Sequence, residues 1–291
     1  MSKTSDFITF AKRQWGWLKW PIALGLLAYL FWTHRQDLAE LRSREIRWPA
    51  LVMAFALCGG SIVLTFYRWY LLVWAQDFPF KVADALRLGF IGYLFNYVAP
   101  GAAGGDIIKA GLIASEQQSR RGVAAATVLL DRLLGMLALF MVGAFAALFQ
   151  EQSLLNDRYV RIIVAVLCGG SVAGLLGLAI LLHPAVPRSR WLAWLIRVRR
   201  IGPIFGSLTN AIILYQNRRG IVIASVLVSI VGHFGMLSSF YFCAQALQLG
   251  NAAPGYWAHL LLIPGAELAA VALPLPGGVG VLEGAVKFCY G

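Results

Sequence analysis

Two short stretches of this chain combine proline and glycine with an acid and a lysine inside strongly apolar sequence. The first runs from Asn96 to Lys109 and the second from Leu273 to Lys287. Glycines in such loops let backbone N–H groups converge at the start of the following helix, where an anion binds well at low dielectric. Both stretches therefore indicate anion recognition. Their acids, Asp106 and Glu283, either cap those helices or bind protons or Na⁺ to drive movement.

Three further charges lie within long apolar runs: Arg68, Asp131 and Arg132. A charged side chain inside a bilayer is costly and marks a functional site by default. Adjacent helix residues point about 100° apart, so Asp131 and Arg132 do not neutralise each other and each needs a partner elsewhere. Two structural alternatives stay open. Asp131 and Arg132 could serve only as structural ion-pair partners that tie helices together. Arg68 could extend to the membrane interface beside Trp69.

Together with Lys109, these charges predict a polar, net-cationic pocket buried in the membrane. Such a pocket suits a phosphate-bearing headgroup whose acyl or polyprenyl chains stay in lipid. The candidate substrate-binding residues are Arg68, Asn96, Pro100, Gly101, Gly104, Gly105, Asp106, Lys109, Asp131, Arg132, Pro276, Gly277, Gly278, Gly280 and Glu283. The four cysteines and four histidines are scattered without ligand spacing, so we expect no metal site, no cofactor and no catalytic residue.

Composition places the chain in a membrane. Of its 291 residues, 59% are hydrophobic and 13% charged, whereas soluble domains carry about 25% charged residues. The net charge of +12 comes from basic residues clustered between apolar runs, as in cytoplasmic loops. Because no nucleic-acid-binding motif accompanies them, we expect no nucleic-acid partner. The fold class predicted is an all-α polytopic membrane protein, with residues 1–291 as a single transmembrane domain.

About five apolar runs reach or approach the roughly 20 residues of a full transmembrane helix. The first follows a basic N-terminus and lacks a small-residue cleavage site, so we expect an uncleaved helix with its N-terminus in the cytoplasm. The five predicted helices are Trp20–Thr33, Trp48–Ala75, Gly122–Phe149, Val160–Leu182 and Ile221–Leu249.

Two further apolar segments are broken by proline and glycine and predict re-entrant hairpins, over residues 88–115 and 257–290. After a basic turn at Lys81–Arg87, only about a dozen apolar residues precede Pro100, too few to span. The second segment contains a helix-breaking Pro264-Gly265. The first hairpin would enter from the cytoplasm and the second from outside, a pattern typical of inverted-repeat transporters.

Charge predicts which connections share a side. Residues 76–87, 116–121 and 183–220 are expected inside, and 150–158 and 250–256 outside. The connection 183–220 carries seven arginines and is predicted to be a cytoplasmic amphipathic linker. Residues 34–47 do not fit this scheme, because they are nominally outside and contain four arginines.

The order and spacing of these motifs resemble one known family. The pattern runs from Asn96 through Pro100-Gly101 and Gly104-Gly105-Asp106 to Lys109, then Asp131-Arg132-Leu133-Leu134-Gly135, and finally Pro274-Leu275-Pro276-Gly277-Gly278-Val279-Gly280 with Glu283. With Arg68-Trp69, it is similar to the transmembrane region of lysylphosphatidylglycerol synthases, a flippase-like family of integral membrane proteins. Lys109 stands where the family has arginine, and Asp131 where glutamate is commoner.

The resemblance implies a lipid translocase of the bacterial cytoplasmic (inner) membrane that moves a phospholipid or polyprenyl-phosphate lipid. The aminoacyl-transferase domain of the synthases is absent, so lysyl transfer is not expected. Relatives usually continue beyond the second motif, and truncation of the C-terminal end is therefore an expectation. The alternatives are a non-catalytic membrane partner of a separate lipid-modifying or glycosyl transferase, and a membrane enzyme acting on a lipid phosphate. Homo-oligomer formation stays open.

Overall fold

The computed structural model describes Trp32, Arg35 and residues 45–98, 104–190, 202–248 and 254–272, and within these residues every regular element is a helix. Residues Arg47–Gly291 belong to one compact unit, and Met1–Ile46 to another. The helices of the larger unit are α3 (Trp48–Trp74), α4 (Val82–Val98), α5 (Gly104–Glu116), the short 3₁₀ helix η1 (Gln118–Arg120), α6 (Arg121–Ala147), α7 (Gln152–Leu155), α8 (Arg158–Leu182), α10 (Gly202–Asn217), α11 (Arg219–Ala246) and α12 (Tyr256–Ala272).

Four of these helices, α3, α6, α8 and α11, are long and apolar enough to cross a membrane. Each has 25 to 28 residues, or about 40 Å at a rise of about 1.5 Å per residue, which exceeds a hydrocarbon core of about 30 Å. The prediction of an all-α polytopic membrane protein is therefore confirmed. The expected first helix, Trp20–Thr33, lies outside the described residues apart from Trp32.

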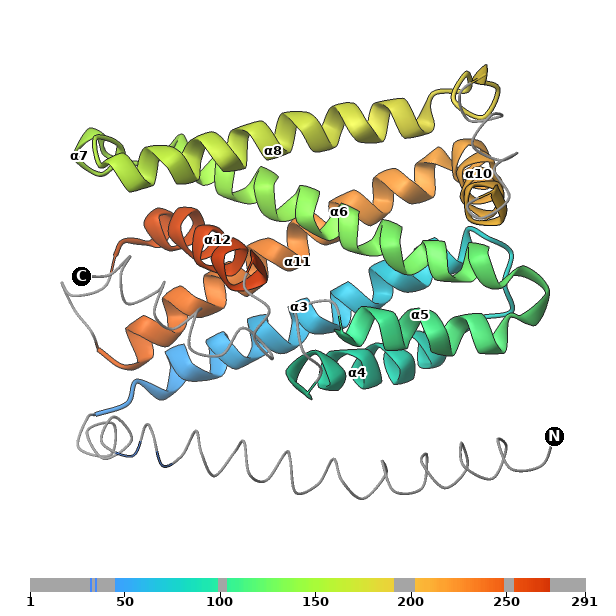
Figure 1. The fold of residues 1–291 in the computed structure, drawn as a ribbon. Coiled ribbons are helices and arrows are strands. Elements are labelled where there is room, and N and C mark those ends of the chain that lie inside the picture. The colour runs from blue at the N-terminus through green and yellow to red at the C-terminus, as the bar shows by residue number, and fades with distance from the viewer. Residues whose placement is uncertain are drawn as a thin grey trace. The chain divides into compact units, whose positions relative to one another are not determined.

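Within the larger unit, α3 and α11 lie side by side, and α6 crosses next to both (Figure 1). Small residues permit this close approach, as is typical of helix packing in membranes. A Cβ at Gly235 of α11 would come within 2.7 Å of the Ser61 hydroxyl of α3. Helix α8 packs mainly on α6 and is the outermost of the long helices, with only Val160, Leu167 and Ser171 buried.

Helices α4 and α5 pack against each other as an antiparallel hairpin. The C-terminal end of α4 and the N-terminal end of α5 lie beside the middle of α3 (Figure 1). With 17 and 13 residues they are about 25 and 20 Å long, so neither crosses a bilayer alone. The stretch Lys81–Arg87 is not the basic turn that the sequence suggested, because α4 already starts at Val82. The Asp84 carboxylate in its first turn accepts the Lys81 N–H at 3.0 Å.

The two limbs of this hairpin meet at glycine. A Cβ at Gly105 would clash with the Gly92 carbonyl oxygen and lie 2.5 Å from Asn96 Oδ1. We therefore expect Gly105→Ala to lower the free energy of unfolding by about 2 kcal/mol, because the backbone cannot yield as a flexible side chain would. Gly111→Ala is the matched control, because Gly111 lies on the same helix and a Cβ there meets nothing within 4 Å. Equal unfolding midpoints for the two variants in SDS-titrated micelles would contradict this packing.

Residues 76–87, 116–121 and 183–220 were predicted to lie on the same side of the membrane. Polar contacts join these three connections at one end of the bundle, in agreement with that prediction. Arg218 pairs with Asp77 at 2.6 Å, and Arg120 donates to the Gln76 carbonyl at 2.8 Å. Gln216 donates to the Leu181 carbonyl at 2.9 Å. The connections at 150–158 and 254–256 meet at the opposite end, where they line a common cavity.

The connection 183–220 is more structured than a polar linker. Its residues 202–217 form α10, which packs on α6, α8 and α11. Tyr215 is buried, and its hydroxyl donates to the Leu72 carbonyl at 3.0 Å. The expected amphipathic segment at 191–201 lies outside the described residues.

Helix α12 corrects a second expectation. Pro264-Gly265 does not break it, because the helix runs without interruption from Tyr256 to Ala272. Leu260, Leu261 and Ile263 are fully buried, so tertiary packing outweighs the backbone hydrogen bond that proline removes. The rest of the second predicted hairpin, residues 273–290, lies outside the described residues, and the inverted repeat stays a prediction.

Candidate functional site

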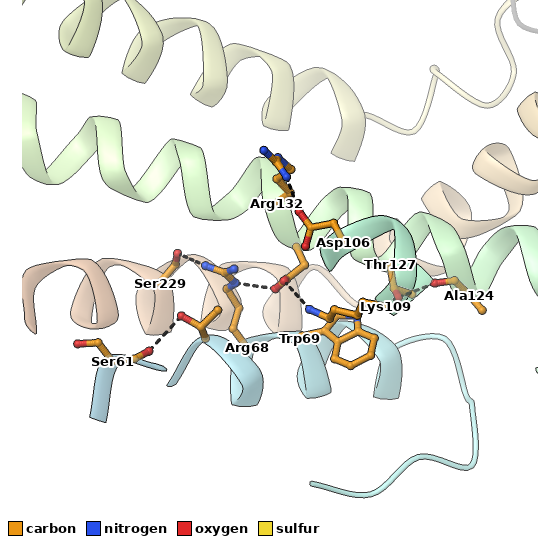
Figure 2. Close-up of polar contacts among 11 residues, drawn as sticks. Ser61, Arg68, Trp69, Asp106, Lys109, Ala124, Thr127, Arg132 and Ser229 are labelled. Atoms are coloured by element: carbon orange, nitrogen blue, oxygen red, sulfur yellow. Dashed lines mark hydrogen bonds and ion pairs between the residues drawn. The ribbon is translucent and has the colours of Figure 1, made fainter. Parts of the chain in front are cut away.

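A buried ion network joins α3, α5 and α6 next to the hairpin (Figure 2). Asp131 of α6 accepts from Arg68 Nε at 2.8 Å through one carboxylate oxygen and from Lys109 Nζ at 3.2 Å through the other. The side chains of Arg68, Asp131 and Lys109 are only 5 to 7% exposed. Arg68 also donates to Ser229 Oγ of α11 at 2.6 Å. Four helices are thus held by one carboxylate and its two cations.

Lys109 has a second support. Its ammonium lies 3.9 Å from the ring centre of Trp69, which places the cation over an aromatic face. The indole N–H of Trp69 donates to Thr127 Oγ1 at 3.2 Å, and that hydroxyl donates to the Ala124 carbonyl at 2.7 Å (Figure 2). Because each partner is itself held, the position of the Lys109 charge is fixed by packing.

A second ion pair lies beside the first but is more open. Arg132 of α6 donates to the Asp106 carboxylate in the first turn of α5, and the two side chains are 29% and 30% exposed. In Figure 2 this pair lies above Arg68. Adjacent residues of α6 therefore have separate partners, as the 100° spacing predicted. Arg132 is the cation of the cluster that a ligand reaches most easily.

The hairpin and two glycines shape the space around these charges. Asn96 near the end of α4 accepts the Gly105 N–H at 2.9 Å and so covers one free donor of the α5 N-terminus. A Cβ at Gly135 of α6 would lie 3.1 Å from a terminal nitrogen of Arg68. Glycine at that position lets the guanidinium lie flat against α6.

The residues of the two ion pairs line one cleft of about 260 Å³, together with Asn96 and Gly135. Among the described residues, its charged side chains are Arg68, Lys109 and Arg132 against Asp106 and Asp131, and these five sum to a net charge of +1. Apolar side chains complete the wall, among them Phe66, Met136 and Leu139. A positive charge in an otherwise apolar setting attracts an anion strongly, because little water screens it. The cleft has the chemistry to hold one phosphate group.

The structure brings six of the predicted site residues to this cleft: Arg68, Asn96, Asp106, Lys109, Asp131 and Arg132. Gly104 and Gly105 begin α5 beside it. The remaining predicted residues lie outside the described part of the chain, namely Pro100, Gly101, Pro276, Gly277, Gly278, Gly280 and Glu283.

Three contributors were not among the predicted site residues. Ser229 binds Arg68, Trp69 faces Lys109, and His233 of α11 lines the cleft. The signal for Ser229 was weak, because single serines are common in apolar helices. Trp69 follows the buried Arg68 directly, but its ring resembled an interfacial aromatic.

Residues 17–291 match the model of the lysylphosphatidylglycerol synthase TM region, and the chain belongs to that family. It is therefore a membrane protein related to lipid modification or translocation. Searches of curated proteins and of solved structures found no match.

Proposed function

We propose that this protein is a lipid translocase that moves a phosphate-bearing lipid between leaflets and makes no chemical change to it. The observation that carries the proposal is the cleft among membrane-spanning helices, closed from one side by the α4–α5 hairpin, whose described residues carry a net charge of +1. A phosphate in this cleft gains charge-assisted hydrogen bonds that lipid cannot supply. The lipid chains stay outside the charged cleft, whose surroundings are apolar: Leu94 and Ile107 of the hairpin and Leu133 of α6 are exposed.

Two features favour movement over permanent binding. The Arg132–Asp106 pair is partly open, so Asp106 competes with a phosphate for the guanidinium and allows release. The hairpin spans only part of the bilayer and presents its α5 N-terminus at the cleft, an arrangement typical of midplane transport sites. Coupling to protons or Na⁺ is part of the same proposal, with Asp106 as the acid.

The test is a leaflet-resolved assay in proteoliposomes. Phosphatidylglycerol with a fluorescent headgroup-proximal label is added to one leaflet, and its loss to the other is followed by quenching with dithionite. We expect transfer well above protein-free liposomes and a lipid mass that is unchanged after transfer. No acceleration, with lipid still copurifying, would favour a non-catalytic partner of a transferase. A changed lipid mass would favour an enzyme.

The distribution of charge also predicts orientation. The end that holds Arg87, Arg120 and Arg218 is expected to face the cytoplasm of a bacterial inner membrane, and with one further crossing in residues 20–33 the N-terminus lies there too. In a variant without native cysteines, we expect an impermeant maleimide to label Ser153→Cys in intact cells. Ser189→Cys should react only after permeabilisation, and the reverse pattern would overturn the assignment.

A further inference from the structure

An apolar groove runs between α6 and α8, next to the charged cleft but separate from its polar walls. Its volume is about 390 Å³. Leucine, methionine, phenylalanine, alanine and glycine are its only lining residue types, over residues 130–140 of α6 and 170–181 of α8. Ten residues of helix are about 15 Å long, which is the length of a substantial part of an acyl chain.

Glycines of α8 create this groove. The Phe140 ring and the Leu137 side chain pack onto Gly170 and Gly174, where a Cβ would come within 2.6 and 2.8 Å of them. Gly177 is different, because a Cβ there meets nothing within 4 Å. The groove is therefore closed at Gly170 and open at Gly177. Gly177 is exposed, so the open part of the groove lies at the surface of the bundle.

The groove adjoins the charged cleft across α6. Met136 lines both spaces. Arg132 lies one turn before Met136 on the same helix face, and Leu133 of the groove directly follows Arg132. An anion bound at Arg132 would therefore lie at the edge of an apolar groove that is about as long as a substantial part of an acyl chain.

We propose that the α6–α8 groove binds one acyl chain of the lipid whose phosphate headgroup is held at Arg132. The inference rests on the proposed translocation of a phosphate-bearing lipid and adds where one flexible hydrocarbon chain of that lipid is bound. Adjacency to the cation selects this occupant. Arg132 lies one turn before Met136 of the groove, and a second apolar helix would fill the groove without using that charge. The chain leaves the headgroup past Met136 and lies along α8.

The probe is phosphatidylglycerol with a photoreactive diazirine in one acyl chain, reconstituted with the full chain in nanodiscs. After irradiation, crosslinked peptides are mapped by mass spectrometry. We expect crosslinks to concentrate on residues 133–140 and 170–181. A diacylglycerol probe with the same chain should crosslink there several-fold less, because it has no phosphate for Arg132. Crosslinks spread evenly over the exposed faces of α3, α8 and α11 would overturn the proposal, as would equal labelling by both probes.

A matched pair of variants tests the groove itself. Gly177→Trp should fill it and reduce crosslinking within it at least fivefold. Gly169→Trp lies on the same helix, also has free space at its Cβ position and does not line the groove, so it should leave crosslinking unchanged. Equal effects of the two variants would contradict the groove.

Failure of this proposal is distinguishable from failure of the translocation proposal. If leaflet transfer is rapid and Gly177→Trp changes neither transfer nor crosslinking, the groove is wrong and translocation stands. If crosslinking follows the groove but no transfer occurs, the groove is right and translocation is wrong.

Discussion

Replacing Asp131 with alanine is expected to destabilise the protein more than any other single change at the cleft. The carboxylate is the shared partner of Arg68 and Lys109, and all three side chains are buried. Without it, two cations remain close together in an apolar setting with no counter-charge. Removing one partner of a buried ion pair costs about 3–5 kcal/mol, and here two partners are left. We expect a loss at the upper end of that range, measured from the SDS-titration midpoint.

A double-mutant cycle with Lys109→Met separates the charge effect from packing. In the wild type, Lys109→Met removes a paired cation and should destabilise. In the Asp131→Ala background the same change removes an unpaired cation, so it should cost less or restore stability, and the two effects will not add. The control is Asp77→Ala, which removes the carboxylate of the Arg218 pair at the polar end of the bundle. That side chain is 57% exposed, and its loss should cost less than about 1 kcal/mol. Similar midpoints for Asp131→Ala and Asp77→Ala would contradict the network.

Much of this network was readable in the sequence because charge in apolar helices is rare. Arg68, Asp131 and Lys109 stood out for that reason, and the angle between adjacent helix residues indicated that Asp131 and Arg132 have different partners. Which partners they take was not predictable. The pairing depends on how α3, α5 and α6 approach, and that depends on close contacts such as the one between Gly135 and Arg68, which are far apart in sequence.

The fold, too, was predictable in part. Long apolar runs gave α3, α6, α8 and α11 within a few residues, since length and hydropathy alone define a membrane span. Proline and charged segments were less reliable as predictors of helix breaks and turns. Pro264 lies inside α12, and Lys81–Arg87 is mostly helix, because burial and a first-turn acid outweigh local propensity there. Helix α10 was missed because arginines surround it, while its buried face is made by Ala211 and Tyr215.

The largest effect on transport is expected from Arg132→Gln. Arg132 is the most accessible cation of the cleft, and its loss removes a charge-assisted interaction with phosphate worth about 1.5–3 kcal/mol, or at least about tenfold in affinity. We expect leaflet transfer to fall at least tenfold and half-saturation to require more lipid. Stability should fall less than in Asp131→Ala, because the Arg132 side chain is 29% exposed and that of Asp131 is 7% exposed. Arg218→Gln, the same chemical change in a pair at the basic end, should leave transfer unchanged.

Asp106→Asn decides whether the pair is a binding device or only a tie between α5 and α6. If Arg132 binds the lipid phosphate, removing its competitor strengthens lipid binding and slows release. Transfer then falls while half-saturation shifts to lower lipid, the opposite shift from that of Arg132→Gln. If the pair is only structural, both variants lose the same contact and half-saturation moves in the same direction. A parallel shift in the two variants, with normal unfolding midpoints, would therefore remove Arg132 from the headgroup site and leave the buried Arg68 and Lys109 as its remaining cations.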